Sequence, residues 1–329
     1  MHWIERHWYR LSALSIALLP LSFVFLAVVM VRRLLYRVRF LASEQLPVPV
    51  IVVGNISVGG TGKTPLVLWL ADLLLSSGFH PGIITRGYGG NEEIQAVPPE
   101  ADTAFAGDEP VLLAQRSRCP VWTGRSRIAA ARALLAHHGE VDVLISDDGL
   151  QHYRMQRQIE IVVVDGARGF GNKLLLPAGP LREPVGRLSS VDAVVINGAT
   201  RLSLPHGHGM HFEGRRFVNL VDPVIQFTAE AFRGKRLHAV AGIGNPQRFF
   251  AHLSALGLTC VAHAFPDHHR YSAADLHFPN ADAVLMTEKD AVKCAAFARE
   301  NFWFLPVEAK VDSALADLIL DRLETRNGR

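Results

Sequence analysis

The chain has 329 residues, of which 49% are hydrophobic and 20% are charged, a composition that excludes an intrinsically disordered polymer and suffices for two α/β domains. Its net charge of +3 arises in the first 40 residues, which hold six arginines and one glutamate and leave the other 289 residues at −2. A folded part without excess positive charge lacks the basic face that nucleic-acid binding needs, so we expect no nucleic-acid partner.

An uncharged hydrophobic run lies near the start of the chain. Residues 11–31 are 21 residues without a charge, which matches the ~20 that cross a bilayer as a helix. The alternative, a cleaved signal peptide, has a shorter apolar region and a small-residue cleavage site. Arginines after the run outnumber those before it and predict a cytoplasmic location for the rest of the chain: Arg32, Arg33, Arg37 and Arg39. Pro20 leaves open whether the anchor spans the membrane or enters one leaflet.

A strand, a glycine-rich loop and a helix follow in that order. Residues 48–53 are a β-branched run, and residues 65–75 have helical length and composition. The loop between them resembles a phosphate-binding loop, although Ser57 stands where the usual pattern has glycine. Lys63 would contact the terminal phosphates of ATP, and the Thr64 hydroxyl would hold Mg²⁺. The expected nucleotide-binding residues are Ser57, Gly59, Gly60, Thr61, Gly62, Lys63 and Thr64.

Two adjacent carboxylates follow a later strand. Residues 141–145 are apolar except for Asp142, and Asp147 and Asp148 come at the carboxyl end of this strand. Mg²⁺-binding carboxylates of P-loop enzymes stand in this place, and the alternative is a plain turn. Apolar runs at 161–165 and 191–196 add buried strands. We therefore predict an α/β fold of the P-loop NTPase type, with a mostly parallel sheet covered by helices on both faces.

The alternation of strands and helices restarts near residue 212. We expect strands at 216–221, 237–241 and 284–287, with a helix that ends near Leu256. Gly242 and Gly244 lack the third glycine of a dinucleotide-binding fingerprint and indicate a tight turn. The predicted parts are an N-terminal membrane anchor at 1–40, a P-loop domain at 41–211, and a second, smaller α/β domain at 212–329 that closes over the active-site cleft.

Two polar segments are ambiguous from the residues alone. Asp108 and the following Glu109 and Pro110 are typical of a helix start, with Asp108 as the N-cap residue. Residues 267–269 are Asp, His and His, which are zinc-binding types, but no other cluster of ligands accompanies them. Zinc therefore stays an alternative for this segment.

Eight segments occur in a fixed order along the chain: GNISVGGTGKTP, ITRGYGG, GDEP, DDGLQH, LLPAGPLREP, AGIGNPQRF, FPDHH and TEKDAVK. With the hydrophobic N-terminus, they resemble the tetraacyldisaccharide 4′-kinase family, the lipid A 4′-kinases, over nearly the whole chain. The resemblance implies an ATP- and Mg²⁺-dependent kinase that phosphorylates the 4′-hydroxyl of an acylated glucosamine disaccharide 1-phosphate and forms lipid IVA. It implies a location on the cytoplasmic face of the bacterial inner membrane, in contact with its lipids. We expect no obligate protein partner.

The resemblance also assigns catalytic roles. Asp108 of GDEP matches the family's catalytic base, and His268 of FPDHH matches the histidine that pairs with it. A carboxylate in this role accepts the hydroxyl proton, while positioning and charge supply most of the catalysis. This reading is compatible with a helix start at Asp108. The expected catalytic residues are therefore Asp108, His268 and Lys63.

Further residues match the family at the metal and nucleotide end. His152 of DDGLQH would join the nucleotide-binding residues, and Glu183 of LREP matches an acidic position of the active site. The expected metal-binding residues are Thr64, Asp147, Asp148 and Glu183. Four arginines in loops could neutralise phosphate charge or simply lie on the surface: Arg86, Arg125, Arg127 and Arg182.

A function of another class would use the same loop and the same acids. A membrane-tethered ATPase or GTPase could act as a switch or a partner-driven motor instead of a metabolic enzyme. Val58 argues against this, because partner-activated ATPases of a related loop pattern carry a lysine there. The lack of an evident guanine-reading motif and the size of the second domain argue against it as well.

Overall fold

The apolar runs of the first half form one nine-stranded sheet in the computed structural model, which describes residues 7–87, 90, 93–200 and 203–327. Its strands are β1 (Val50–Gly54), β2 (Pro81–Thr85), β3 (Gln95–Ala96), β4 (Val121–Thr123), β5 (Val143–Asp147), β6 (Ile159–Asp165), β7 (Ala193–Asn197), β8 (Gly207–Glu213) and β15 (Glu308–Val311). Their order is β15-β8-β7-β6-β1-β5-β2-β4-β3, and every pair from β8 to β4 is parallel. The predicted fold class is confirmed.

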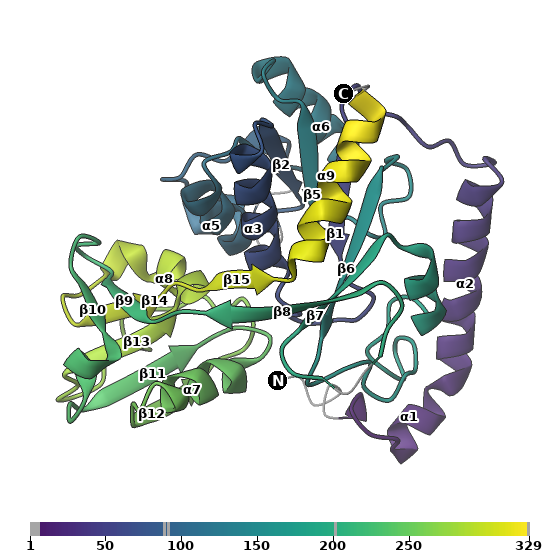
Figure 1. The fold of residues 1–329 in the computed structure, drawn as a ribbon. Helices are drawn as coiled ribbons and strands as arrows, with labels where there is room; N and C mark the ends of the chain where they lie inside the picture. Colours follow the sequence, from purple (N-terminus) through teal and green to yellow (C-terminus); the bar gives the residue numbers. More distant parts are fainter. Residues whose placement is uncertain (1–6, 88–89, 91–92, 201–202, 328–329) are drawn as a thin grey trace.

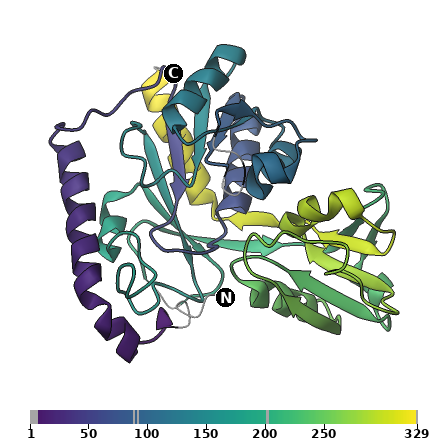
Figure 2. The same cartoon turned by 180° about the vertical axis from the view of Figure 1, so that it is seen from behind.

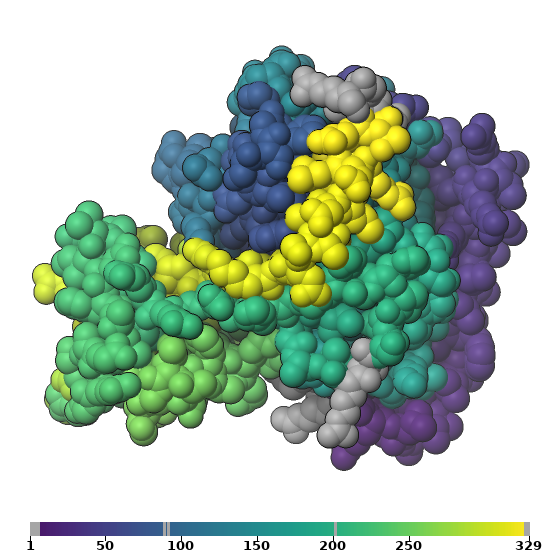
Figure 3. Space-filling view, viewed as in Figure 1, coloured from purple at the N-terminus to yellow at the C-terminus, as the bar shows by residue number. Residues whose placement is uncertain are grey.

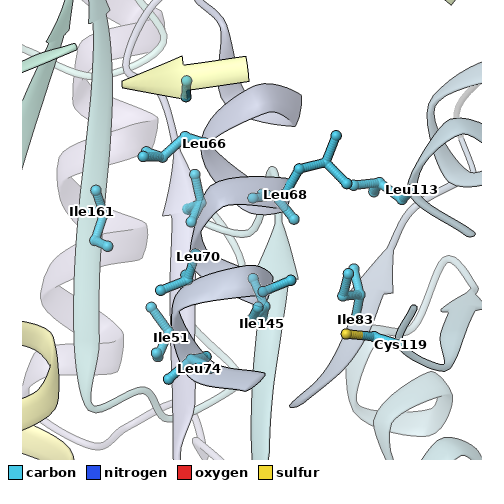
Figure 4. Packing of buried hydrophobic residues seen from close by; sticks show 14 of the residues in the cluster. Ile51, Leu66, Leu68, Leu70, Leu74, Ile83, Leu113, Cys119, Ile145 and Ile161 are labelled. Carbon is cyan, nitrogen blue, oxygen red and sulfur yellow. The ribbon is translucent and has the colours of Figure 1, made fainter. Parts of the chain in front are cut away.

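Helices cover both faces of this sheet, because successive residues of a buried strand point to opposite sides. On one face lie α3 (Lys63–Ser76), α4 (Thr103–Ala106), α5 (Asp108–Ser117) and α9 (Ser313–Asn327). On the other lie α6 (Arg127–His137) and the 3₁₀ helix η2 (Val185–Ser190). Figure 4 shows Leu66, Leu70 and Leu74 of α3 turned toward the strands that carry Ile51 and Ile161.

A six-stranded sheet forms the smaller unit. Its strands are β9 (Arg216–Asn219), β10 (Gln226–Thr228), β11 (Leu237–Ala241), β12 (Cys260–Ala264), β13 (Ala283–Thr287) and β14 (Phe302–Leu305), in the order β10-β9-β14-β13-β11-β12. Four of them, β12, β11, β13 and β14, are parallel. Helix α7 (Pro246–Ala255) packs on one face and α8 (Glu288–Cys294) on the other, and η3 (Ala229–Phe232) and η4 (Ala295–Phe297) complete the unit.

The chain crosses between the two units twice, from β8 to β9 and from β14 back to β15 (Figure 1). Strands β8 and β15 pair antiparallel at the edge of the larger sheet, and α9 then buries Leu315, Ile319 and Leu323 in the larger core. In Figure 3 this last segment lies across the larger unit. The predicted second domain at 212–329 therefore differs from the structure, in which residues 308–327 belong to the larger unit. An amphipathic helix at the chain end does not reveal which of two cores it covers.

The hydrophobic N-terminal run forms two helices, α1 (Ala13–Ala17) and α2 (Leu19–Arg37). Pro20 lies in the first turn of α2, where a residue without an N–H is tolerated. Helix α2 is the single candidate membrane span in the described part of the chain: its most apolar 18 residues have a mean hydropathy of 1.8, and 6% of them are buried. Its exposed apolar side chains include Leu21, Phe23, Val24, Val28, Met30, Val31 and Leu34.

Helix α2 also docks on the larger unit, along the edge opposite the smaller one (Figure 2). The buried Ser22 hydroxyl donates to the Leu175 carbonyl at 2.8 Å and accepts from the Ala178 N–H at 3.1 Å. Arg33 donates to Ser190 at 2.9 Å, and the rings of Tyr36 and Tyr153 lie 5.8 Å apart. The helix is therefore both an exposed apolar surface and a packed part of the fold.

We predict that Ser22→Ala destabilises the docking of α2. The change leaves the buried Ala178 N–H without its acceptor, which costs about 1–3 kcal/mol, and removes one of the two donors to the Leu175 carbonyl, which keeps the Gly179 N–H. A lower thermal unfolding midpoint in detergent, together with faster proteolysis between α2 and β1, is the expected result. The matched control is Ser189→Ala, whose hydroxyl makes an exposed bond within η2. Equal midpoints for the two variants would contradict the prediction.

Candidate active site

The loop between β1 and α3 has the backbone of a phosphate cradle. Gly59 and Gly62 have φ angles of +101° and +97°, a region that side chains disfavour, and Gly62 directly precedes α3. The Asn55 side chain donates to the Gly59 carbonyl at 3.3 Å, and Asn197 at the end of β7 donates to the Thr61 carbonyl at 2.9 Å. These two amides hold the loop in place, and sequence reasoning did not identify either of them.

The predicted loop residues lie together at the N-terminus of α3. Lys63 and Thr64 form its first turn, Thr61 is buried, and Ser57 pairs with the strand-like segment at Leu181. Gly60 faces the smaller unit. Backbone N–H groups and the positive end of a helix dipole make this a site for phosphate.

Asp147 and Asp148 lie beside this loop, because β1 and β5 are parallel neighbours and Val53 pairs with Asp147. Asp148 pairs with Lys63 at 3.4 Å and with Arg182 at 3.3 Å. Burial alone would raise the pKa of Asp148, but the two cations outweigh it and lower the value to about 2. Asp147 is buried and accepts a bond from Thr85 at 3.3 Å, and burial raises its pKa to about 7.

The pair of aspartates fits a magnesium site that is completed by the nucleotide. Among the described residues, no hydrogen bond reaches Oδ1 of the buried Asp147, and the partner of Asp148 Oδ1 is the Lys63 ammonium at 3.4 Å. No group of three or more His, Cys, Asp or Glu side chains in the described ranges could hold a metal ion by itself. Mg²⁺ commonly takes one or two carboxylates and fills its shell with phosphate oxygens and water. Thr64 and these aspartates provide such a partial set.

Glu183 and His152 were also predicted for this end of the site, and each has its own surroundings. Both oxygens of the buried Glu183 are occupied, by Gln151 at 2.8 Å and Tyr153 at 2.6 Å, and Arg187 lies 3.4 Å away. The described contacts do not bring Glu183 together with Asp147 and Asp148, so its metal-binding role stays a prediction. Burial and nearby arginines lower the pKa of His152 to about 4, so its ring is neutral near pH 7.

The predicted catalytic pair joins the two units. Nδ1 of His268, in the segment after β12, lies 3.1 Å from each carboxylate oxygen of Asp108 at the start of α5. Gly107, not Asp108, is the N-cap residue of α5, so the N-cap interpretation of Asp108 is wrong. Burial would raise the pKa of Asp108, but His268 and Lys289 lower it to about 2. Burial opposes protonation of His268, yet the hydrogen bond that its Nδ1 donates to Asp108 raises its pKa above the usual 6.5.

Lys289, on α8, is a second link between the units, and no individual role for this lysine was predicted from the sequence. Its Nζ lies 2.9 Å from Glu109, 3.3 Å from Asp267 and 3.9 Å from Asp108. Lys289 stands in TEKDAVK, one of the eight segments that carry the family resemblance. The segment itself assigned no chemical role to the lysine.

A third link lies behind the phosphate-binding loop. Arg248 of α7 pairs with Asp165 at the end of β6 at 3.1 Å. A Cβ atom on Gly244 would stand 2.5 Å from the Gly60 nitrogen, so the turn after β11 is pressed against the loop backbone. The predicted tight turn at Gly242 and Gly244 is confirmed, since α7 begins at Pro246.

The loop arginines differ in their contacts. Arg127 is buried and donates to the carbonyls of Gly124 and Asp147, so it supports the fold beside the carboxylates. Arg182 reaches Asp148, whereas Arg86 and Arg125 lie on exposed loops. The zinc alternative for residues 267–269 has no support in the described part of the chain, where His268 bonds Asp108 and His269 pairs with Asp275.

Comparisons with known proteins give consistent results. A family model described as tetraacyldisaccharide-1-P 4′-kinase matches residues 14–324. A tetraacyldisaccharide 4′-kinase of Methylobacillus flagellatus is 52% identical over 98% of this chain and 96% of its own length, and one of Azoarcus sp. is 51% identical over 97% and 94%. The crystal structure of LpxK from Aquifex aeolicus in complex with ATP has a TM-score of 0.78 and 30% identity, over 94% of this chain and 99% of that one.

We predict that Gly244→Ala slows ATP turnover without weakening ATP binding. The added methyl group would strike the Gly60 backbone, so the smaller unit must move away and carry His268 from Asp108. A displacement of about 1 Å can cost roughly 10²-fold in rate. Calorimetry should show unchanged ATP affinity beside this lower turnover. Gly186→Ala, where a Cβ atom meets nothing within 4 Å, is the control. Turnover equal to that control would contradict the prediction.

Proposed function

The chain belongs to the tetraacyldisaccharide-1-P 4′-kinase family, and we propose that its Asp108–His268 pair accepts the proton of the substrate hydroxyl. The protein is an ATP-dependent kinase that phosphorylates the 4′-hydroxyl of tetraacyldisaccharide 1-phosphate and forms lipid IVA in lipid A biosynthesis. The alternative of a nucleotide-driven switch is therefore wrong. The observation that carries the proposal is the contact of this pair, across two units, beside a phosphate-binding loop.

In this proposal the larger unit holds Mg-ATP. The loop N–H groups and Lys63 bind the phosphates, and Lys63 exchanges its contact with Asp148 for the γ-phosphate. Thr64 and the aspartates Asp147 and Asp148 would hold Mg²⁺, which would supply positive charge against the phosphates. Arg182, which already reaches Asp148, adds positive charge at the same end of the loop.

The proton acceptor is His268 in this scheme, with Asp108 behind it. Both oxygens of Asp108 face Nδ1, so this nitrogen carries the hydrogen and Nε2 keeps its lone pair. A carboxylate with a pKa near 2 is a weak base, whereas the His268 imidazole, whose pKa is raised by its bond to Asp108, is the stronger base of the two. The role of base, which the family resemblance gave to Asp108, thus passes to its partner.

We also propose the cytoplasmic face of the bacterial inner membrane as the place of the reaction. The exposed apolar face of α2 would enter the membrane, and the arginines at its C-terminal end would stay on the cytoplasmic side. The acyl chains of the lipid substrate would remain in the membrane while the sugar reaches the cleft. The docked contacts of α2 set the distance between membrane and cleft in this arrangement.

Asp108→Asn should lower kcat by roughly 10²–10⁴-fold, because the base His268 loses the carboxylate that sets its tautomer and orientation, with little change in the KM for ATP. The Asp108 charge raises the pKa of His268, so its loss lowers that pKa and moves the acid limb of the rate profile to lower pH. Radiolabelled phosphate transfer from ATP to the acylated disaccharide 1-phosphate, measured across pH, tests both effects. The control is Asp102→Asn, the exposed N-cap of α4, because Asn caps as well as Asp. An enzyme within about threefold of wild type would contradict the role.

Placing two aspartates on the exposed face of α2, as Val24→Asp with Val31→Asp, should release the protein from membranes. Each charge costs about 2.5–3.5 kcal/mol inside a bilayer, and the docking contacts of Ser22 stay intact. Flotation with phospholipid vesicles after a carbonate wash measures the effect. The matched control carries Val221→Asp and Val224→Asp, exposed valines of the smaller unit. If both double variants float with the vesicles, α2 is not the membrane contact.

A further inference from the structure

The carboxyl ends of three parallel strands of the smaller unit meet at one edge, which faces the phosphate-binding loop. Strand β11 leads to the turn at Gly244, β12 leads to Asp267 and His268, and β13 leads to Lys289. The Thr287 hydroxyl accepts from the Asp290 N–H at 3.1 Å and caps α8. Lys289 is therefore fixed in the first turn of a short helix rather than carried on a loose loop.

Lys289 stands among three carboxylates that come from both units. Glu109 and Asp108 belong to α5 of the larger unit, and Asp267 precedes His268 in the smaller one. The ammonium is largely buried, with 16% of the side chain exposed. Arg116 of α5 pairs with Glu288 of α8 alongside, so the two helices are joined by ion pairs at neighbouring positions.

The other nearby cations are engaged elsewhere. Lys293 pairs with Asp290 at 2.7 Å, and Lys63 pairs with Asp148. Without the Lys289 ammonium, the three carboxylates would face one another across the boundary with His268 as their remaining partner at short range. Like charges this close repel, and partly buried charges without a partner are costly. Separation of α5 from the segment of His268 is the simplest relief.

We propose that Lys289 is a positioning residue that holds Asp108 and His268 together by binding carboxylates on both sides of the domain boundary. The inference rests on the proposed function of that pair. Lys289 acts through its neighbours and not through contact with the reacting atoms. Its contribution is expected in kcat, because ATP binds to the loop of the larger unit.

The charge of Lys289 predicts a shift in the pH dependence of the rate, which distinguishes the positioning role from a purely structural one. Asp108 and Asp267 favour protonation of His268, and Lys289 opposes it. Glu109 adds a further negative charge beside Lys289, and the more distant Lys293 acts on Asp108. Loss of Lys289 therefore raises the pKa of His268 and moves the acid limb of the rate profile to higher pH. This shift is opposite to that expected for Asp108→Asn, and a merely structural residue would produce neither.

The test compares Lys289→Met and Lys289→Arg with the control Lys310→Met, which removes an exposed lysine of β15. Phosphate transfer by the full-length protein in detergent should fall by roughly 10²-fold in kcat for Lys289→Met, with the KM for ATP little changed. The acid limb should move to higher pH. Lys289→Arg should recover most of the loss, and Lys310→Met should match wild type. In a His268→Ala background, Lys289→Met should add little, since members of a unit are non-additive.

A Lys289→Met enzyme within about threefold of wild type, or one with full additivity to His268→Ala, overturns the proposal. If Lys289→Met unfolds at a much lower temperature than wild type, Lys289→Gln is judged by the same criteria. Two other results would contradict the proposed function itself: a wild-type protein that does not phosphorylate the acylated disaccharide, or a fully active His268→Ala variant.

Discussion

A hydrogen bond between Asp108 and His268 joins the two α/β units directly beside the phosphate-binding loop. The two residues come from different units. Asp108 is the first residue of α5 in the larger unit, where it is followed by Glu109, and His268 lies after β12 at the edge of the smaller sheet. The bond lowers the pKa of the carboxyl group and raises that of the imidazole, so the pair acquires its proton chemistry only when the units touch. In the proposed mechanism, closure of the units would therefore also form the base, and no competent base would stand over ATP in an open, water-filled site.

The approach of the units follows from how parallel sheets present their residues. In both sheets the polar residues lie at the carboxyl ends of parallel strands, where loops lead into helix N-termini. The larger sheet brings Asp147 next to the loop that precedes Lys63, and the smaller one brings Gly244, His268 and Lys289 to a single edge. Two such edges facing each other put several helix N-termini around one space, and that arrangement favours the phosphates of ATP and the carboxylates that surround them.

Local patterns in the sequence predicted where strands and helices lie along the chain. They did not predict which distant strands and side chains meet in the folded protein. Strand β11 has the predicted bounds, and β1, β5 and α3 differ from expectation by one or two residues at their ends, because apolar runs and glycines are local signals. The return of β15 and α9 to the larger sheet depends on a pairing about 100 residues away, as Lys310 opposite His211 illustrates, and no local signal contains it. The same limit applies to the site. Lys63 stands in a recognisable loop, but Asn197 and Lys289 matter through neighbours that only the folded chain supplies.

Helix α2 and the aspartates Asp147 and Asp148 are connected through one loop. Tyr153 packs against Tyr36 of α2, and its hydroxyl donates to Glu183, which also accepts from Gln151. Gln151 donates to the Asn55 carbonyl as well, and Asn55 holds the phosphate-binding loop. Only four residues separate Tyr153 from Asp148 in the chain. Buried, fully bonded carboxylates such as Glu183 transmit small shifts because their partners cannot relax independently. A tilt of α2 in the bilayer would thus act on the geometry of the cradle as well as on the location of the enzyme.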